Sequence, residues 1–75
     1  MSRLAGFSGR EVGRVAELNG WTWFRAKGSH RTYRKVGVRL NLSIPVHNPL
    51  AEGILRTLLK TMDMTVDEFL AVARK

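Results

Sequence analysis

Residues 21–44, WTWFRAKGSHRTYRKVGVRLNLSI, have the composition of short β-strands separated by turns. The aromatic side chains of 21–26 favour a strand over a helix, because the segment is too short for a stable helix. The Lys-Gly-Ser sequence at 27–29 favours a turn, and 30–35 continues as a second strand. This half of the stretch predicts a β-hairpin.

The second half of the stretch predicts one further strand. Val36-Gly37 is a second turn signal, and residues 38–44 then alternate apolar and polar side chains. Strict alternation is typical of an antiparallel strand with one buried side. Pro45 should end this strand, because proline cannot donate to a ladder. Three strands joined by short turns predict an antiparallel meander.

Helices are predicted on both sides of the meander. Residues 8–11, Ser-Gly-Arg-Glu, form a capping box and predict a helix over about 8–19. After a linker at 46–49, a second helix carries a broad apolar stripe. Residues 65–68, Thr-Val-Asp-Glu, form another capping box and begin a short third helix that runs to the C-terminus. The stripe consists of Ile54, Leu55, Leu58, Leu59 and Met62.

The order α-β-β-β-α-α predicts a single two-layer α+β domain over residues 1–75, with a three-stranded antiparallel sheet. We expect the helices on one face of the sheet and the other face free to bind. Because alternate strand residues share a side, Trp21 and Trp23 are expected against the core, and Tyr33 is expected to be available for contact with a base.

Size and composition narrow the class of protein. A chain of 75 residues is one small domain, and without cysteine it has no disulfide framework or Cys-based metal site. No signal peptide and no apolar run long enough for a membrane span are recognised, so we expect a cytoplasmic protein. Thirteen Lys and Arg against six Asp and Glu give a net charge of +7, which suits a polyanionic partner.

The positive charge gathers in the predicted sheet. Between Leu18 and Ala51 the chain has no Asp or Glu, and basic residues there alternate with aromatic ones. This pattern is typical of a surface that holds nucleic acid, and it exceeds what an ordinary solvated face shows. The basic residues are Arg25, Lys27, Arg31, Arg34, Lys35 and Arg39.

Two histidines are the candidates for chemistry. His30 ends the 27–29 turn, and imidazole can give or take a proton near neutral pH. A surface histidine at a hairpin turn is the plainer alternative. His47 follows Pro45-Val46 and could share acid and base work, or could simply cap a helix or face water. Neither histidine has a carboxylate near it in sequence, so no metal site is expected.

The motifs together resemble the HicA-type toxin family of bacterial toxin–antitoxin systems, also called YcfA-like. The resemblance extends from about Ser8 to Ala71 and rests on several pieces in one order. Val36 to Leu42 departs from the commoner form, because the usual Asp-Gly hairpin is missing. The matching pieces are Ser8–Val12, Gly20-Trp21, Arg25–His30, Pro45–His47, Gly53–Lys60 and Thr65–Phe69.

The resemblance implies a fold like the double-stranded-RNA-binding domain, α-β-β-β-α, with a short extra C-terminal helix here. It also implies a ribonuclease that cuts mRNA and halts translation, and a HicB-type antitoxin that covers the active site. The family's catalytic histidine lies in its Gly-Ser-His motif and corresponds to His30. Its Pro-x-His element corresponds to His47.

These observations combine into one hypothesis and two alternatives. The hypothesis is cleavage of single-stranded mRNA without metal or cofactor by a monomer that forms a heteromeric complex with its antitoxin. One alternative is a non-catalytic RNA-binding module, which the lack of basic residues at 48–53 disfavours. The other is a basic face that only docks an acidic protein. Beside the catalytic His30, with His47 as a possible second, the expected RNA-binding residues are Arg25, Lys27, Gly28, Ser29, Arg31, Tyr33, Arg34 and Lys35.

Overall fold

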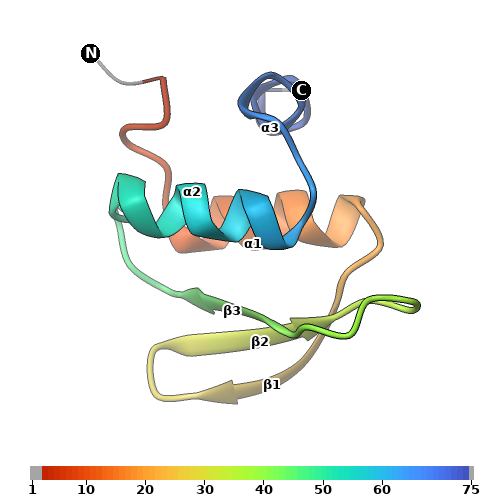
Figure 1. Cartoon of the computed structure of the whole chain (residues 1–75). Helices are drawn as coiled ribbons and strands as arrows, with labels where there is room; N and C mark the ends of the chain where they lie inside the picture. The colour runs from red at the N-terminus through yellow and green to blue at the C-terminus, as the bar shows by residue number, and fades with distance from the viewer. Residues whose placement is uncertain (1–2, 75) are drawn as a thin grey trace.

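The computed structural model describes residues 3–74, which form three helices and one three-stranded sheet (Figure 1). The order α-β-β-β-α-α confirms the predicted α+β fold. Within the described residues, no helix has the length and apolar character needed to cross a bilayer. The elements are α1 (Gly9–Leu18), β1 (Thr22–Lys27), β2 (His30–Arg34), β3 (Leu42–Pro45), α2 (Glu52–Thr61) and α3 (Val66–Ala73).

Both predicted capping boxes form. The Ser8 hydroxyl accepts from the Glu11 amide at 3.1 Å, and the Ser8 amide donates to the Glu11 carboxylate at 2.9 Å. Thr65 and Glu68 make the same pair of bonds at the start of α3. Each box satisfies two amide groups that the first turn of a helix leaves without partners. Local side-chain chemistry therefore determines where α1 and α3 begin.

The sheet is an antiparallel meander in the order β1-β2-β3, but β3 is shorter than the predicted strand over 38–44. Tyr33 pairs with Leu42, so in the same register Val38 would lie opposite Gly37, inside the turn itself. The amide of Val38 instead donates to the carbonyl of Lys35 and closes that turn. Residues 36–41 form a loop, and Pro45 belongs to β3, opposite His30.

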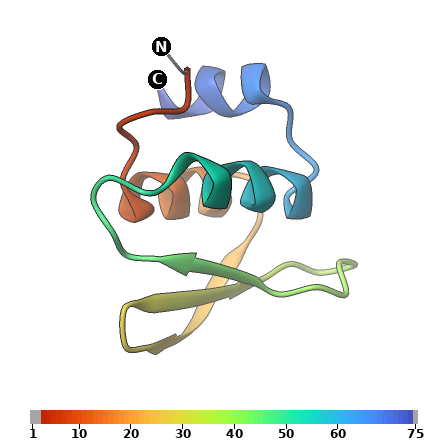
Figure 2. The ribbon, with the colours of Figure 1, turned by 60° about the vertical axis from the view of Figure 1, so that its left-hand side comes forward.

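The elements lie in three layers and not in the predicted two, because α3 forms a layer of its own. α1 and α2 cover one face of the sheet, as predicted, and α3 packs against α1 on the side away from the sheet (Figures 1 and 2). Phe69 of α3 meets Phe7 in an edge-on contact, with ring centres 4.9 Å apart. Ile54 is 39% exposed, so the apolar stripe of α2 is narrower than predicted. The core between these layers includes Leu4, Val12, Val15, Ala16, Trp21, Tyr33, Leu42, Ile44, Leu55, Leu59 and Phe69.

Candidate nucleic-acid interface and histidine pair

Cross-strand pairing assigns each strand residue to one side of the sheet. Residues directly opposite each other in an antiparallel pair share a side. Tyr33 pairs with Leu42, and Arg31 with Ile44, and Tyr33, Leu42 and Ile44 are buried on the helix-covered side. His30 is an alternate residue of β2 and therefore lies on the opposite side, which none of the helices within residues 3–74 covers (Figure 1).

A β-bulge in β1 determines which of its basic residues share the side of His30. Trp23 pairs with Tyr33, but the next paired residue is Arg25, opposite Thr32, so Phe24 is an additional residue. If Phe24 were a regularly paired residue instead, strict alternation would turn Arg25 to the side of Trp23. The bulge shifts the alternation by one residue, and Lys27 consequently lies opposite His30. The resulting basic face consists of Arg25, Lys27, His30 and Arg34.

The fold brings the two histidines together, although 16 positions separate them in the chain. His30 pairs with Pro45, and His47 follows two residues later. Their ring centres lie 6.5 Å apart, with the ring planes inclined by 65°. Both side chains are exposed. Two imidazoles thus stand at one end of the basic face, next to the β1–β2 turn.

Backbone contacts hold the His47 segment in place. The amide of Val46 donates to the carbonyl of Ser29, and the amide of Gly9 donates to the carbonyl of His47 at 2.8 Å. A Cβ atom on Gly9 would overlap the carbonyl oxygen of Pro45, so this approach of α1 to the end of β3 requires glycine. The start of α1 therefore helps to position His47. Sequence reasoning missed this role, because a glycine after an N-cap serine has no local signal for it.

The turn between β1 and β2 leaves space beside His30. Gly28 has φ +60, a conformation that other residues seldom adopt, and a Cβ there would meet nothing within 4 Å. Ser29 follows it and is exposed. Both predicted binding residues of the turn are thus accessible from solvent.

The aromatic residues take different positions from those predicted. Tyr33 is only 2% exposed and its hydroxyl lies against Gly13 of α1, so it is a core residue and we remove it from the RNA-binding set. Trp21 is buried as predicted, but Trp23 is 45% exposed. β1 is an edge strand of the sheet, and all six of its residues are exposed. Phe24 is exposed as well and contacts arginines of the basic face.

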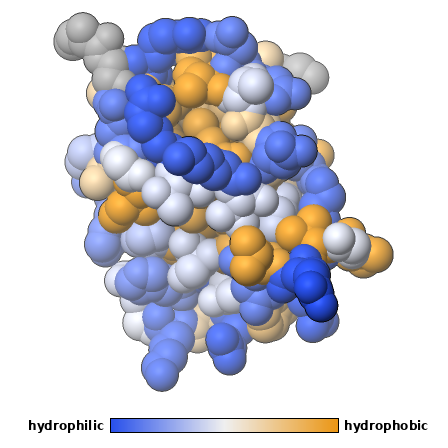
Figure 3. Space-filling view, viewed as in Figure 1, coloured by the Kyte–Doolittle hydropathy of each residue, from blue (hydrophilic) through white to orange (hydrophobic). Residues whose placement is uncertain are grey.

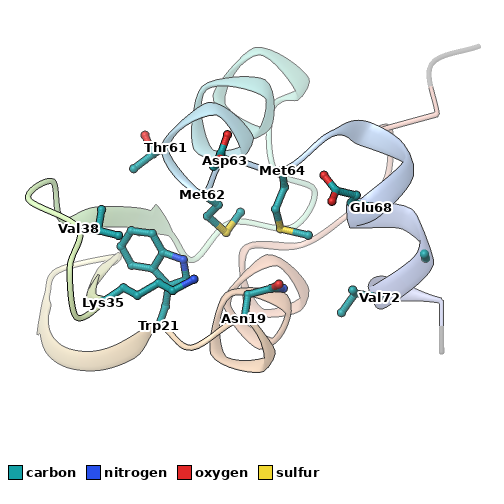
Figure 4. A pocket seen from close by; sticks show the side chains of 11 residues that line it. Asn19, Trp21, Lys35, Val38, Thr61, Met62, Asp63, Met64, Glu68 and Val72 are labelled. Atoms are coloured by element: carbon teal, nitrogen blue, oxygen red, sulfur yellow. The ribbon is translucent and has the colours of Figure 1, made fainter.

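Two predicted binding residues lie away from the basic face. Arg31 is on the side of Tyr33, and its guanidinium lies over the ring of Trp23, 4.5 Å from its centre. Lys35 follows β2 and lies beside Trp21 in a groove at the opposite end of the sheet from the histidines, and Glu68 of α3 lines the far side of that groove (Figure 4). The predicted RNA-binding residues are therefore not all on the basic face, because Arg31 lies on the helix-covered side and Lys35 lies in the groove beside Trp21.

Polarity differs between the strands and the loop that joins β2 to β3. Seen as in Figure 3, hydrophilic residues predominate over the strands at the bottom, and hydrophobic atoms gather at the loop on the right. Val36 is 99% exposed there and Leu40 67% exposed. Since the strands contain no Asp or Glu, the charge of the basic face is not offset within the sheet.

Comparison with known proteins identifies the class of this chain. Residues 9–64 match the family described as "HicA toxin of bacterial toxin-antitoxin". The protein is thus the toxin component of a bacterial toxin–antitoxin system, which implies an antitoxin partner. The chain belongs to the HicA toxin family, as its motifs indicated. A search among curated proteins found no match.

Proposed function

We propose that this toxin is an endoribonuclease that binds single-stranded mRNA on the basic face and cuts it beside the histidine pair, thereby stopping translation. The 6.5 Å separation of the rings of His30 and His47 carries the proposal. An acid or base must come within about 2.6–3.2 Å of the oxygen whose proton it moves. Two imidazoles at this separation can approach two oxygens of one phosphodiester from either side.

The reaction uses the ribose itself as nucleophile. One imidazole takes the proton of the 2′-hydroxyl, the 2′-oxygen attacks phosphorus, and the bond from phosphorus to the 5′-oxygen breaks. The other imidazole gives its proton to that leaving oxygen. The products are a 2′,3′-cyclic phosphate and a free 5′-hydroxyl, and either histidine can take either role. Arg25, Lys27 and Arg34 stabilise the negative charge that develops at phosphorus.

The proposed reaction needs no metal ion. Among residues 3–74, no group of three or more His, Cys, Asp or Glu side chains could hold one. Cleavage is therefore expected to continue in EDTA. RNA with 2′-deoxyribose at the cleaved nucleotide should resist cleavage, and the product ends should carry the cyclic phosphate. Cleavage that stops in EDTA, or that proceeds at the 2′-deoxy position, would contradict this mechanism.

The decisive variant is His30→Ala. General acid–base help is worth about 10²–10⁴-fold, so we expect the cleavage rate to fall by that range while RNA binding stays nearly constant. The assay is single-turnover cleavage of a labelled unpaired RNA, with anisotropy for binding. Arg56→Gln is the matched control, because Arg56 lies on α2 and pairs with Glu52 away from the basic face.

The second histidine has its own test. If His47 moves the other proton, His47→Ala should lose cleavage to a similar extent, and the double variant should lose little more than either single one. Unchanged cleavage by His47→Ala would show that His47 does not move the second proton. Unchanged cleavage by His30→Ala would show that His30 is not the catalytic residue. RNA binding without any cleavage by the parent protein would favour the alternative function, a non-catalytic RNA-binding module.

The partner follows from the same surface. A HicB-type antitoxin that neutralises the toxin is proposed to cover the basic face and the histidines, and its contact surface should be acidic. The toxin is expected to be a monomer when free and to enter a heteromeric complex with the antitoxin in the cytoplasm. Docking should survive His30→Ala, since the charges of the face remain.

A further inference from the structure

Phe24 is an exposed aromatic residue at an unusual position, the bulge of β1. It is 39% exposed, although apolar area for the core is scarce in a domain of 75 residues. Two guanidinium groups lie near its ring, Arg34 at 4.9 Å and Arg25 at 5.7 Å from the centre. We propose that Phe24, with these two arginines, forms a subsite for one unpaired nucleobase of the RNA.

Stacking of a nucleobase on Phe24 would give this exposed ring a function. Proteins recognise single-stranded RNA by splaying bases onto aromatic side chains and guanidinium planes. Phe24 and the arginines supply both kinds of surface within 6 Å of one ring centre. The same arginines can bind the phosphate of the nucleotide whose base stacks. Since a phenyl ring offers no hydrogen bonds, this subsite should accept any base, with purines favoured by their larger ring area.

The subsite is close to the histidine pair. His30 pairs with Lys27, and Phe24 comes three residues earlier in the same strand. At about 3.3 Å per residue this separation is roughly 10 Å along β1. The stacked base therefore belongs to a nucleotide that flanks the scissile phosphate. This step rests on the proposed function, because it takes RNA as the substrate and the histidines as the cleavage site.

Trp23 is the neighbouring aromatic residue and serves as the comparison. It lies on the side of Tyr33, away from His30. Arg31 covers its ring at 4.5 Å, and its indole N–H donates to the carbonyl of Arg25 at 3.0 Å. An RNA strand that reaches the histidines along the basic face passes Phe24 and not Trp23. Trp23→Ala is therefore the matched control for Phe24→Ala.

The experiment measures how binding depends on single bases. His30→Ala protein, which keeps the RNA uncut, is titrated with a short unpaired oligoribonucleotide and with a series in which one base at a time is replaced by an abasic ribose. We expect one position where loss of the base weakens binding roughly 5- to 100-fold. In the Phe24→Ala background, removing that base should weaken binding no further. The Phe24→Tyr and Trp23→Ala variants should still bind the abasic RNA more weakly than the intact RNA.

Several results would overturn the subsite. These are an abasic series without a position that weakens binding fivefold, a sensitive position that persists in Phe24→Ala, and sensitivity that disappears only in Trp23→Ala. Failure of the proposed function gives a different result. If the parent protein binds RNA with this base dependence but does not cut it, the catalytic proposal fails and the subsite stands. If it cuts RNA without base dependence, the subsite alone fails.

Discussion

The two sides of the sheet differ although the same three strands build both. On the helix-covered side, Tyr33, Leu42 and Ile44 are each at most 2% exposed. On the opposite side, Arg25 and His30 are open to solvent. Neighbouring residues of one strand thus serve either folding or the proposed chemistry. The difference teaches that stability and activity should be separable by substitutions one residue apart.

The sharpest test of this separation uses adjacent residues of β3. Ile44 is 1% exposed in the core, and Ser43 is exposed on the other side. Ile44→Ala should lower the free energy of unfolding by about 2–5 kcal/mol, because it removes buried methyl groups and leaves a cavity. Ser43→Ala should change it by less than about 0.5 kcal/mol. Denaturant titration followed by tryptophan fluorescence measures both values, and equal losses would contradict the division.

Two glycines of α1 test whether the start of this helix affects the histidine pair or only the core. A Cβ on Gly9 would displace the end of β3 and with it His47, whereas a Cβ on Gly13 would meet the hydroxyl of Tyr33 in the core. Displacement of a reacting group by about 1 Å can cost 10²-fold in rate. We expect Gly9→Ala to lower cleavage per folded molecule roughly 10- to 100-fold.

Gly13→Ala is the matched control for Gly9→Ala. It should lower stability, with little change in cleavage by the folded fraction, and Tyr33→Phe in the same chain should restore stability by removing the hydroxyl. A proton spectrum of the imidazole region follows the histidine pair directly, and only Gly9→Ala should alter it. If both glycine variants reduce cleavage equally, Gly9 has no particular role in positioning His47.

The smallest expected effect concerns single charges. Binding to single strands should depend on salt with a log–log slope of about −0.7 for each phosphate contacted. Arg25→Gln should make this slope shallower by about 0.7, because Arg25 lies on the basic face. Arg14→Gln removes the same charge from an exposed position on α1 and should leave the slope unchanged. Equal changes of slope in the two variants would show that RNA binding depends on the net charge of the protein and not on which side of the sheet carries the charge.

Much of the fold could be predicted from local patterns. The capping boxes at Ser8 and Thr65 depend on residues three positions apart, and both form as predicted. The element order was also predicted, because each strand and helix has its own periodicity. The length of β3 was not, since alternation continues through residues 38–41 although no strand lies opposite them.

The candidate site was less predictable, because its geometry depends on contacts between distant residues. His30 and His47 could be singled out by residue type, but their 6.5 Å separation follows from the pairing of His30 with Pro45. Tyr33, which was expected to be available to a base, is a core residue, and Trp23, which was expected against the core, is exposed. Burial depends on which strand the helices cover, and β1 lies at the uncovered edge, which no pattern within β1 indicates.

The bulge at Phe24 has a consequence for how related toxins should be compared. Deleting this one residue would close the bulge and leave Arg25 opposite Thr32 and Lys27 opposite His30, so the basic face would keep its side chains. A deletion between Arg25 and Lys27 would instead turn one of these two side chains to the other side of the sheet. Among homologues, a single-residue gap at position 24 should therefore be more common than a gap at 25–27.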